Sequence, residues 1–183
     1  MLRLTLDTYC VIVAAQDLTH RAEIDQLVDL AQAGKIELWL TTAYAYDQST
    51  APADKHAVNL AWLAERPCIG TLPGPFRIGL SPIGGHDVIS PDSMKSADEK
   101  IRAIVLPELL AAGKMPAGRR MHDVQHLSAH HMAGNDAFVT NDHDMLTKQA
   151  ALQSEVGITV LNPAAAVTLA TGQGSAHDGS NAS

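Results

Sequence analysis

The sequence lacks both a dense set of cysteines and a long apolar run. Its two cysteines, Cys10 and Cys68, lie among apolar or small neighbours. Two such thiols are typical of a reducing cytoplasm rather than of a disulfide-stapled secreted fold. No apolar run approaches the roughly 20 residues that span a bilayer, and Asp7 interrupts the N-terminal run where a signal peptide would continue. We therefore expect a cytoplasmic protein with no membrane partner.

Internal repeats are also absent, and the length suits a single hydrophobic core. A chain of 183 residues that is 46% hydrophobic can bury one sizeable core, so one domain is expected. The net charge of -7 is unevenly distributed, because residues 95–120 hold six basic residues against three acidic ones. A local basic strip of this kind either holds phosphates near a metal ion or forms an ordinary solvated helix face.

Segments with strand and helix patterns alternate along the chain. Strand patterns occupy 2–6, 36–41, 137–140 and 158–161, and helix patterns occupy 22–33, 53–66, 96–112, 122–133 and 145–153. Ser96 and Glu99 form a capping-box pattern for the helix at 96–112, and Pro107 is expected to bend or split that helix. This order predicts an α/β fold with a parallel, doubly wound sheet, in which ligands gather at the carboxyl ends of the strands.

Two stretches depart from this alternation. Residues 67–95 hold five of the nine prolines and five glycines, so we expect an irregular insertion there, either a functional flap or a surface excursion without chemistry. Residues 171–183 are rich in Gly, Ser, Asn and Ala and carry no apolar face, which predicts a disordered tail. The folded domain is therefore expected to span residues 1–170.

Acidic residues lie where the strand patterns end. Asp7 follows the first strand, Asp123 lies at the start of the 122–133 helix pattern, and Asp142 and Asp144 follow the 137–140 strand. Taken singly, each acid is often a helix cap or a solvated strand end. Together, and without a basic neighbour in sequence, they provide the oxygen ligands that a hard divalent cation needs. The joint pattern favours a site of converging titratable groups.

Several of these motifs resemble those of the PIN-domain family. They are Leu6-Asp7-Thr8, Asp123 on its helix, Val139-Thr140-Asn141-Asp142-His143-Asp144-Met145-Leu146 and Gly157-Ile158-Thr159-Val160-Leu161-Asn162-Pro163. The resemblance covers most of residues 1–167 and is most specific in the C-terminal third. It implies a Rossmann-like three-layer α/β/α fold with a central parallel sheet. It also implies metal-dependent ribonuclease activity, similar to that of the bacterial toxin ribonucleases of toxin-antitoxin pairs.

The resemblance assigns roles to particular residues. It implies that the catalytic acids are Asp7, Asp47, Asp123 and Asp142, and that Mg²⁺ or Mn²⁺ is bound by Asp7, Asp123, Asp142 and Asp144. Asp47 stands where the family usually carries a glutamate, and Tyr9 where many members carry a small polar residue. Thr8, Thr140 and Asn141 would orient the carboxylates by hydrogen bonds. The implied partners are RNA, a cognate antitoxin protein and a second copy of the chain.

Two other functions stay open at this point. The substitutions at Asp47 and Tyr9 are compatible with a catalytically weak or inactive PIN-fold module that binds RNA or protein. The i, i+4 spacing of His122 and His126 resembles a zinc-hydrolase helix with Asp123 in place of the usual glutamate. His130 lies roughly 12 Å from His122 along such a helix, too far to complete the same zinc site.

Overall fold

The computed structural model describes residues 1–49, 51–77, 81, 85–89, 94–111 and 119–172. Their strands form a parallel five-stranded sheet in the order β3-β2-β1-β4-β5. These strands are β1 (Leu2–Leu6), β2 (Ile36–Thr41), β3 (Ile69–Leu72), β4 (Ala137–Val139) and β5 (Val160–Leu161). The order runs outward in both directions from β1, so the chain reverses its direction of winding between β1 and β4.

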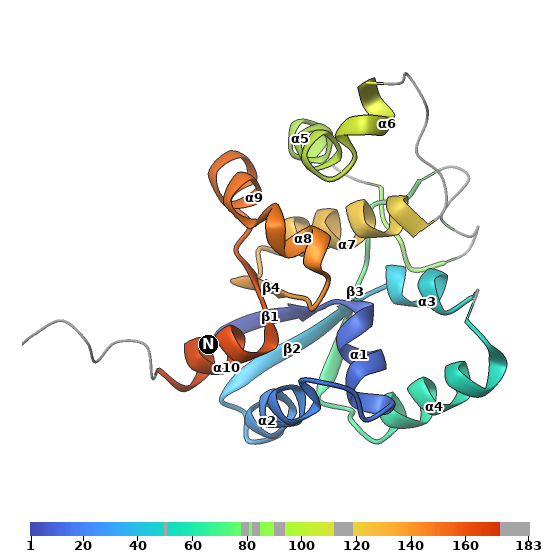
Figure 1. Ribbon diagram of the computed structural model, residues 1–183, viewed down its shortest axis with the longest axis vertical. Helices are drawn as coiled ribbons and strands as arrows, with labels where there is room; N and C mark the ends of the chain where they lie inside the picture. Colours follow the sequence, from blue (N-terminus) through green and yellow to red (C-terminus); the bar gives the residue numbers. More distant parts are fainter. Residues whose placement is uncertain (50, 78–80, 82–84, 90–93, 112–118, 173–183) are drawn as a thin grey trace, which may run out of the picture.

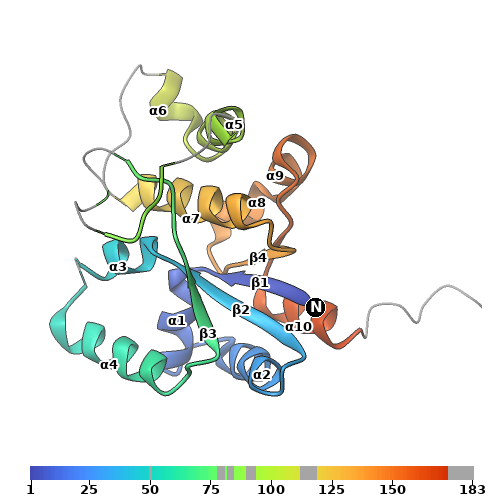
Figure 2. The same cartoon turned by 180° about the vertical axis from the view of Figure 1, so that it is seen from behind.

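Helices cover both faces of this sheet (Figures 1 and 2). On one side lie α1 (Thr8–Ala15), α2 (Arg21–Gln32), α4 (Ala53–Ala64) and α10 (Pro163–Thr171). On the other lie α5 (Lys95–Val105), α6 (Pro107–Ala111), α7 (Arg119–Ala133), α8 (His143–Thr147) and α9 (Gln149–Val156). The short helix α3 (Ala43–Gln48) follows β2 and contacts α7.

Strand side chains alternate between two apolar cores, as a period of two requires. Leu4 and Leu6 of β1 pack in the core beneath α1 and α2, together with Val139 of β4. Phe138 of β4 points the other way, into a second core beneath α5, α7 and α9. Two cores on opposite faces of a parallel sheet make a three-layer, Rossmann-like α/β architecture, which confirms the predicted fold class.

Several boundaries agree with the sequence patterns. The first two strands, β1 and β2, have the predicted limits, and α2 and α4 match their predicted helices to within about two residues at each end. Pro107 does split the predicted third helix, because α5 ends at Val105 and α6 begins at Pro107. Within the described ranges no helix has an apolar stretch long enough to cross a bilayer.

Other details were predicted wrongly. The capping box at Ser96 does not form, because α5 begins at Lys95 and its N-cap, Met94, makes no side-chain capping bond. The helix expected at 145–153 is divided into α8 and α9, since the chain leaves helical geometry at Lys148. Helices α1, α3 and α10 were not predicted. Helix α1 is apolar along nearly its whole length, so its sequence shows no helical periodicity.

The insertion predicted at 67–95 is only partly irregular. Residues Ile69–Leu72 form β3, an edge strand whose Gly70 pairs with Trp39 of β2. A Cβ atom on Gly70 would lie 2.5 Å from the Trp39 ring, so the glycine that obscured the strand pattern is what lets the indole pack there. In the predicted tail, Thr171 ends α10 and Gly172 caps it with a φ of 69°, while residues 173–183 lie outside the described part.

Candidate acidic site

The carboxyl ends of β1 and β4 place two of the expected acids side by side. Asp7 follows β1 directly, and its backbone N–H donates to the carbonyl of Val139 at 2.9 Å. Asp142 follows β4 by three residues and forms the N-cap of α8. Because β1 and β4 flank the point where the strand order reverses, this edge is where ligands bind in open α/β sheets.

Asp7 is buried and closely coupled to its surroundings. Its Oδ2 accepts a hydrogen bond of 2.6 Å from the hydroxyl of Thr140. Burial raises the pKa of Asp7 above its ordinary value, and the carboxylates of Asp47 and Asp142 raise it further, against the opposing effects of His126 and Thr140. A cation bound beside Asp7 would therefore stabilise its ionised form.

Asp123 adds a third carboxyl from α7, where it lies in the second turn rather than at the helix start expected from the sequence. Burial raises its pKa to about 7, and the charges of Asp7, Asp142 and Asp47 contribute to the rise. Asp7 and Asp142 therefore lie close enough to Asp123 to disfavour its ionised form. Burial and these neighbouring charges therefore make the ionised form of Asp123 unfavourable near neutral pH.

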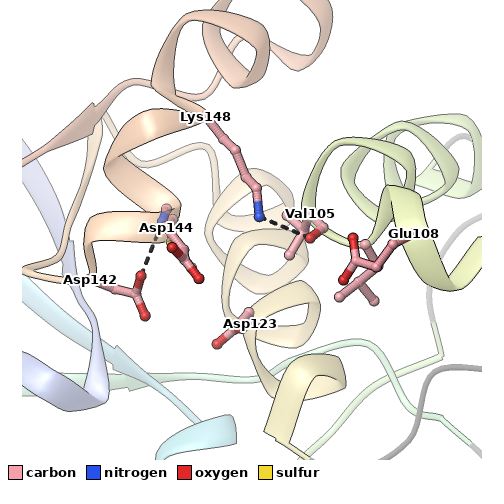
Figure 3. Close-up of a pocket in the computed structure, with 8 residues that line it drawn as sticks. Val105, Glu108, Asp123, Asp142, Asp144 and Lys148 are labelled. Atoms are coloured by element: carbon pink, nitrogen blue, oxygen red, sulfur yellow. Dashed lines mark hydrogen bonds between the residues drawn. The ribbon is translucent and has the colours of Figure 1, made fainter.

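A hollow connects Asp123 and Asp142 to the solvent, and we call it the acidic hollow (Figure 3); Asp7 is not among its lining residues. It is lined by Val105, Leu106, Glu108, Asp123, Asp142, Asp144, Met145 and Lys148. Figure 3 shows the carboxyl groups of Asp123, Asp142 and Asp144 pointing into the same space. Asp142 and Asp144 are exposed, and Asp142 Oδ1 accepts from the backbone N–H of Met145 at 3.1 Å, which fixes the start of α8. Lys148 reaches across and donates to the Val105 carbonyl at 3.0 Å.

Asp47 differs from the other acids in its hydrogen-bond partners. Its Oδ1 lies 2.6 Å from His122 Nδ1, and its Oδ2 lies 2.9 Å from His126 Nε2. The Thr8 hydroxyl also donates to Oδ2, at 2.6 Å. Although burial alone would raise it, the hydrogen bonds from these three partners hold the pKa of Asp47 well below its usual range. Thr8 therefore supports Asp47, whereas Thr140 supports Asp7.

Three histidines of α7 pack beside this cluster of acids. His126 is buried, with Nδ1 2.6 Å from the Thr41 hydroxyl and Nε2 on Asp47, so both ring nitrogens have partners. His130 faces Thr5 of β1, and burial lowers its pKa to about 4. His122 and His126 thus share one carboxylate and His130 points elsewhere. This geometry gives no support to the zinc alternative.

The acids fit a hard cation by their chemistry. Within the described part of the chain, no group of three or more His, Cys, Asp or Glu side chains converges tightly enough to enclose a metal ion by itself. Magnesium keeps several water ligands and is commonly bound through one or two carboxylates, so a loose set of oxygen donors is compatible with it. Such an ion would stabilise the ionised forms of Asp7 and Asp123, which burial and the neighbouring carboxylates disfavour.

The sequence did not predict some of the residues at this edge of the sheet. Thr41 and Lys148 follow no recognisable motif, and only the fold brings them here. The link from His122 and His126 to Asp47 had a partial signal in the i, i+4 spacing, which indicates a shared helix face. Asn141 lies beside the acidic hollow rather than among its lining residues.

No family model matches the chain, and no curated protein matches its sequence. The resemblance to the PIN-domain family therefore rests on the motifs themselves.

Proposed function

We propose that the chain is a PIN-like, metal-dependent ribonuclease that hydrolyses RNA phosphodiester bonds at the acidic hollow. One observation carries this proposal: Asp7, Asp123 and Asp142 come from three separate elements and are electrostatically coupled at the edge where β1 and β4 end. Asp7 also lies 4.0 Å from Nε2 of His126, and Asp142 is exposed to solvent. Even so, the charges of Asp7 and Asp142 raise the pKa of the buried Asp123, and such coupled carboxyls are an arrangement that proteins use for catalysis or ion binding.

Each residue of the cluster has a distinct part in the proposal. Asp7, Asp123 and Asp142 would hold Mg²⁺ or Mn²⁺, with Asp144 at the rim of the acidic hollow. A bound divalent ion supplies a water of lowered pKa and neutralises charge on the phosphodiester. Thr140 orients Asp7 through its 2.6 Å hydrogen bond. Asp47 is a positioning residue, because its bonds to His122 and His126 hold α3 against α7.

Lys148 gives the acidic hollow a positive charge among its described lining residues. Its ammonium group lies at the wall opposite Asp123, held by the Val105 carbonyl (Figure 3). An RNA backbone approaching several carboxylates meets unfavourable charge, and a lysine at the wall offsets part of it by contacting a phosphate oxygen. We assign Lys148 this phosphate-binding role.

A binding module without turnover is the second candidate. The hydrogen bonds of Asp47 favour a binding module. Asp47 stands in place of the family's glutamate, and its carboxylate is already bonded to two histidines and a threonine. The narrower idea of a toxin with a cognate antitoxin, and that of a homodimer, rests on the resemblance alone.

A cleavage assay separates these functions. End-labelled RNA is incubated with the purified chain in EDTA, and then with Mn²⁺ or Mg²⁺ restored. We expect cleavage only when a divalent ion is present, with loss of at least a hundredfold in Asp123→Asn and full activity in Asp54→Asn, an exposed acid on α4. RNA binding without cleavage under all conditions would favour the binding module. Cleavage in EDTA, or by Asp123→Asn at the normal rate, would contradict the proposal.

A further inference from the structure

A second hollow adjoins the acidic hollow, and we call it the Tyr9 hollow. It is lined by Tyr9, Asn141, His143 and the two acids Asp142 and Asp144, and these two also line the acidic hollow. The two hollows therefore share a wall. A polymer with a phosphate at the acidic hollow would place a neighbouring nucleoside within reach of the Tyr9 hollow.

Tyr9 is an unusual residue to leave exposed at this place. Its side chain is 42% exposed, although it follows Asp7 and Thr8 directly at the first turn of a helix with a buried interior. Because α1 fixes its backbone, the ring stands at a defined position beside the acids rather than on a mobile loop. Exposed aromatic rings next to a nucleic-acid site act as stacking surfaces, since every base presents a flat π-face.

The other lining side chains carry unused polar groups. Within the described ranges, no hydrogen bond engages the Tyr9 hydroxyl, the Asn141 amide or the His143 ring. An amide offers both donors and an acceptor, which is the set that reads the edge of a base. A flat apolar ring and adaptable polar groups in one open hollow match the chemistry of a nucleobase, not of a second phosphate.

We propose that the Tyr9 hollow is a nucleobase subsite, in which the Tyr9 ring stacks on one unpaired base and Asn141 and His143 hydrogen-bond to its edge. This inference rests on the proposed function for the identity of the polymer. It narrows the substrate to RNA that is unpaired beside the cleaved bond, because a base within a duplex is already stacked and has its pairing edge occupied. The bulky ring at position 9 then provides the stacking surface for this base.

The test measures binding and not cleavage, so that it stands apart from the ribonuclease proposal. A short single-stranded RNA containing 2-aminopurine is titrated with the full chain in EDTA, where metal-dependent turnover is excluded, and both anisotropy and 2-aminopurine quenching are recorded. Tyr9→Ala removes the ring and Tyr9→Phe keeps it. Phe76→Ala is the matched control, because Phe76 is an aromatic residue of similar exposure, 39%, that lines neither hollow.

We expect Tyr9→Ala to weaken binding about tenfold or more and to abolish the quenching, while Tyr9→Phe and Phe76→Ala stay within about twofold of the wild type. A matching blunt RNA duplex should bind more weakly and show no dependence on Tyr9. Equal binding by Tyr9→Ala and the wild type, equal sensitivity of the duplex, or no RNA binding at all would overturn the subsite. Tyr9-dependent binding by a chain that never cleaves RNA would support the subsite and refute the ribonuclease.

Discussion

Asp47 and His126 are joined by a hydrogen bond of 2.9 Å, although 79 residues separate them in sequence. The bond links α3, which follows β2, to the middle of α7. His122, one turn earlier on α7, binds the other oxygen of the same carboxylate. The position that the PIN resemblance assigns to a catalytic acid is therefore also a structural link between α3 and α7, the helix that carries Asp123.

Replacing Asp47 by asparagine should destabilise the protein markedly. The amide keeps the shape but loses the charge that both histidines face, and removing one partner of a buried ion pair costs roughly 3–5 kcal/mol. Urea unfolding at neutral pH measures this loss. Asp29→Asn, an exposed acid on α2, is the control and should change the unfolding free energy by less than about 0.5 kcal/mol. Equal unfolding curves for both variants would contradict the link.

Asp123 should make stability depend on pH. Its folded-state pKa of about 7 lies above the ordinary value of 3.8, so the folded state binds more protons than the unfolded state between these values. The associated stability is fully present below about pH 4 and is lost as pH rises through 7. Without divalent ions, Asp123→Asn should therefore be close to the wild type at pH 4 and increasingly more stable than it above that pH, by about 2–4 kcal/mol at pH 8.

The measurement is chemical denaturation in EDTA at pH 5 and pH 8, with Asp54→Asn as the control. A stability difference between Asp123→Asn and the wild type that does not grow with pH would show that Asp123 is solvated and uncoupled from Asp7 and Asp142. Adding Mn²⁺ at pH 8 should narrow the difference, because the ion stabilises the ionised form that only the wild type contains.

Thr140 should control metal affinity through Asp7. Thr140→Val keeps the buried volume but removes the hydroxyl that donates to Asp7 at 2.6 Å and accepts from the Asp142 backbone at 3.0 Å. We expect Mn²⁺ affinity to fall about 10- to 100-fold, as is typical for residues that orient metal ligands. Thr140→Ser restores the hydroxyl and should bind nearly as well as the wild type. Similar Mn²⁺ affinities for the valine and serine variants would rule out this orienting role.

Lys148 should act on RNA binding rather than on the chemical step. Lys148→Gln removes the charge at the wall of the acidic hollow, so KM for RNA should rise about five- to tenfold with kcat largely unchanged. Steady-state cleavage kinetics at low salt give both constants. Lys35→Gln is the matched control, because Lys35 is an exposed lysine before β2, at the opposite end of that strand from the acidic hollow. A fall in kcat alone would instead place Lys148 in the reaction.

Much of the fold followed from local sequence patterns. The apolar residues of β1 and β2, and the helical spacing of Ile24, Leu27 and Val28 in α2, encode their elements over short distances. Such signals can be read without tertiary information. Helix α1 and strand β3 could not be predicted in this way. Helix α1 is apolar nearly throughout, and β3 contains Gly70, whose fit against Trp39 exists only in the folded sheet.

The residues of the candidate site also differ in how far the sequence predicts them. Asp7 and Asp142 were found from their places after strands, since parallel strands deliver their carboxyl ends to one edge. Asp123 was identified from its helix and the resemblance. The partners of Asp47 and the location of Lys148 depend on how α3 and α9 pack against α7 and α5, which no short segment encodes. Asp47 is distinguished from the other acids by its hydrogen bonds across the fold, and not by motif spacing.

The most direct test of this account is an isothermal titration of the purified chain with Mn²⁺ at pH 8, repeated with Asp7→Asn, Asp123→Asn and Asp142→Asn. We predict that the wild type binds Mn²⁺ and that each of the three variants binds it at least tenfold more weakly, a loss of about 1.4 kcal/mol or more, whereas Asp54→Asn is unchanged. A wild type that releases no heat of binding and gains no thermal stability from Mn²⁺, or three variants that bind it as tightly as the wild type, would contradict the claim that these carboxyls share one ion.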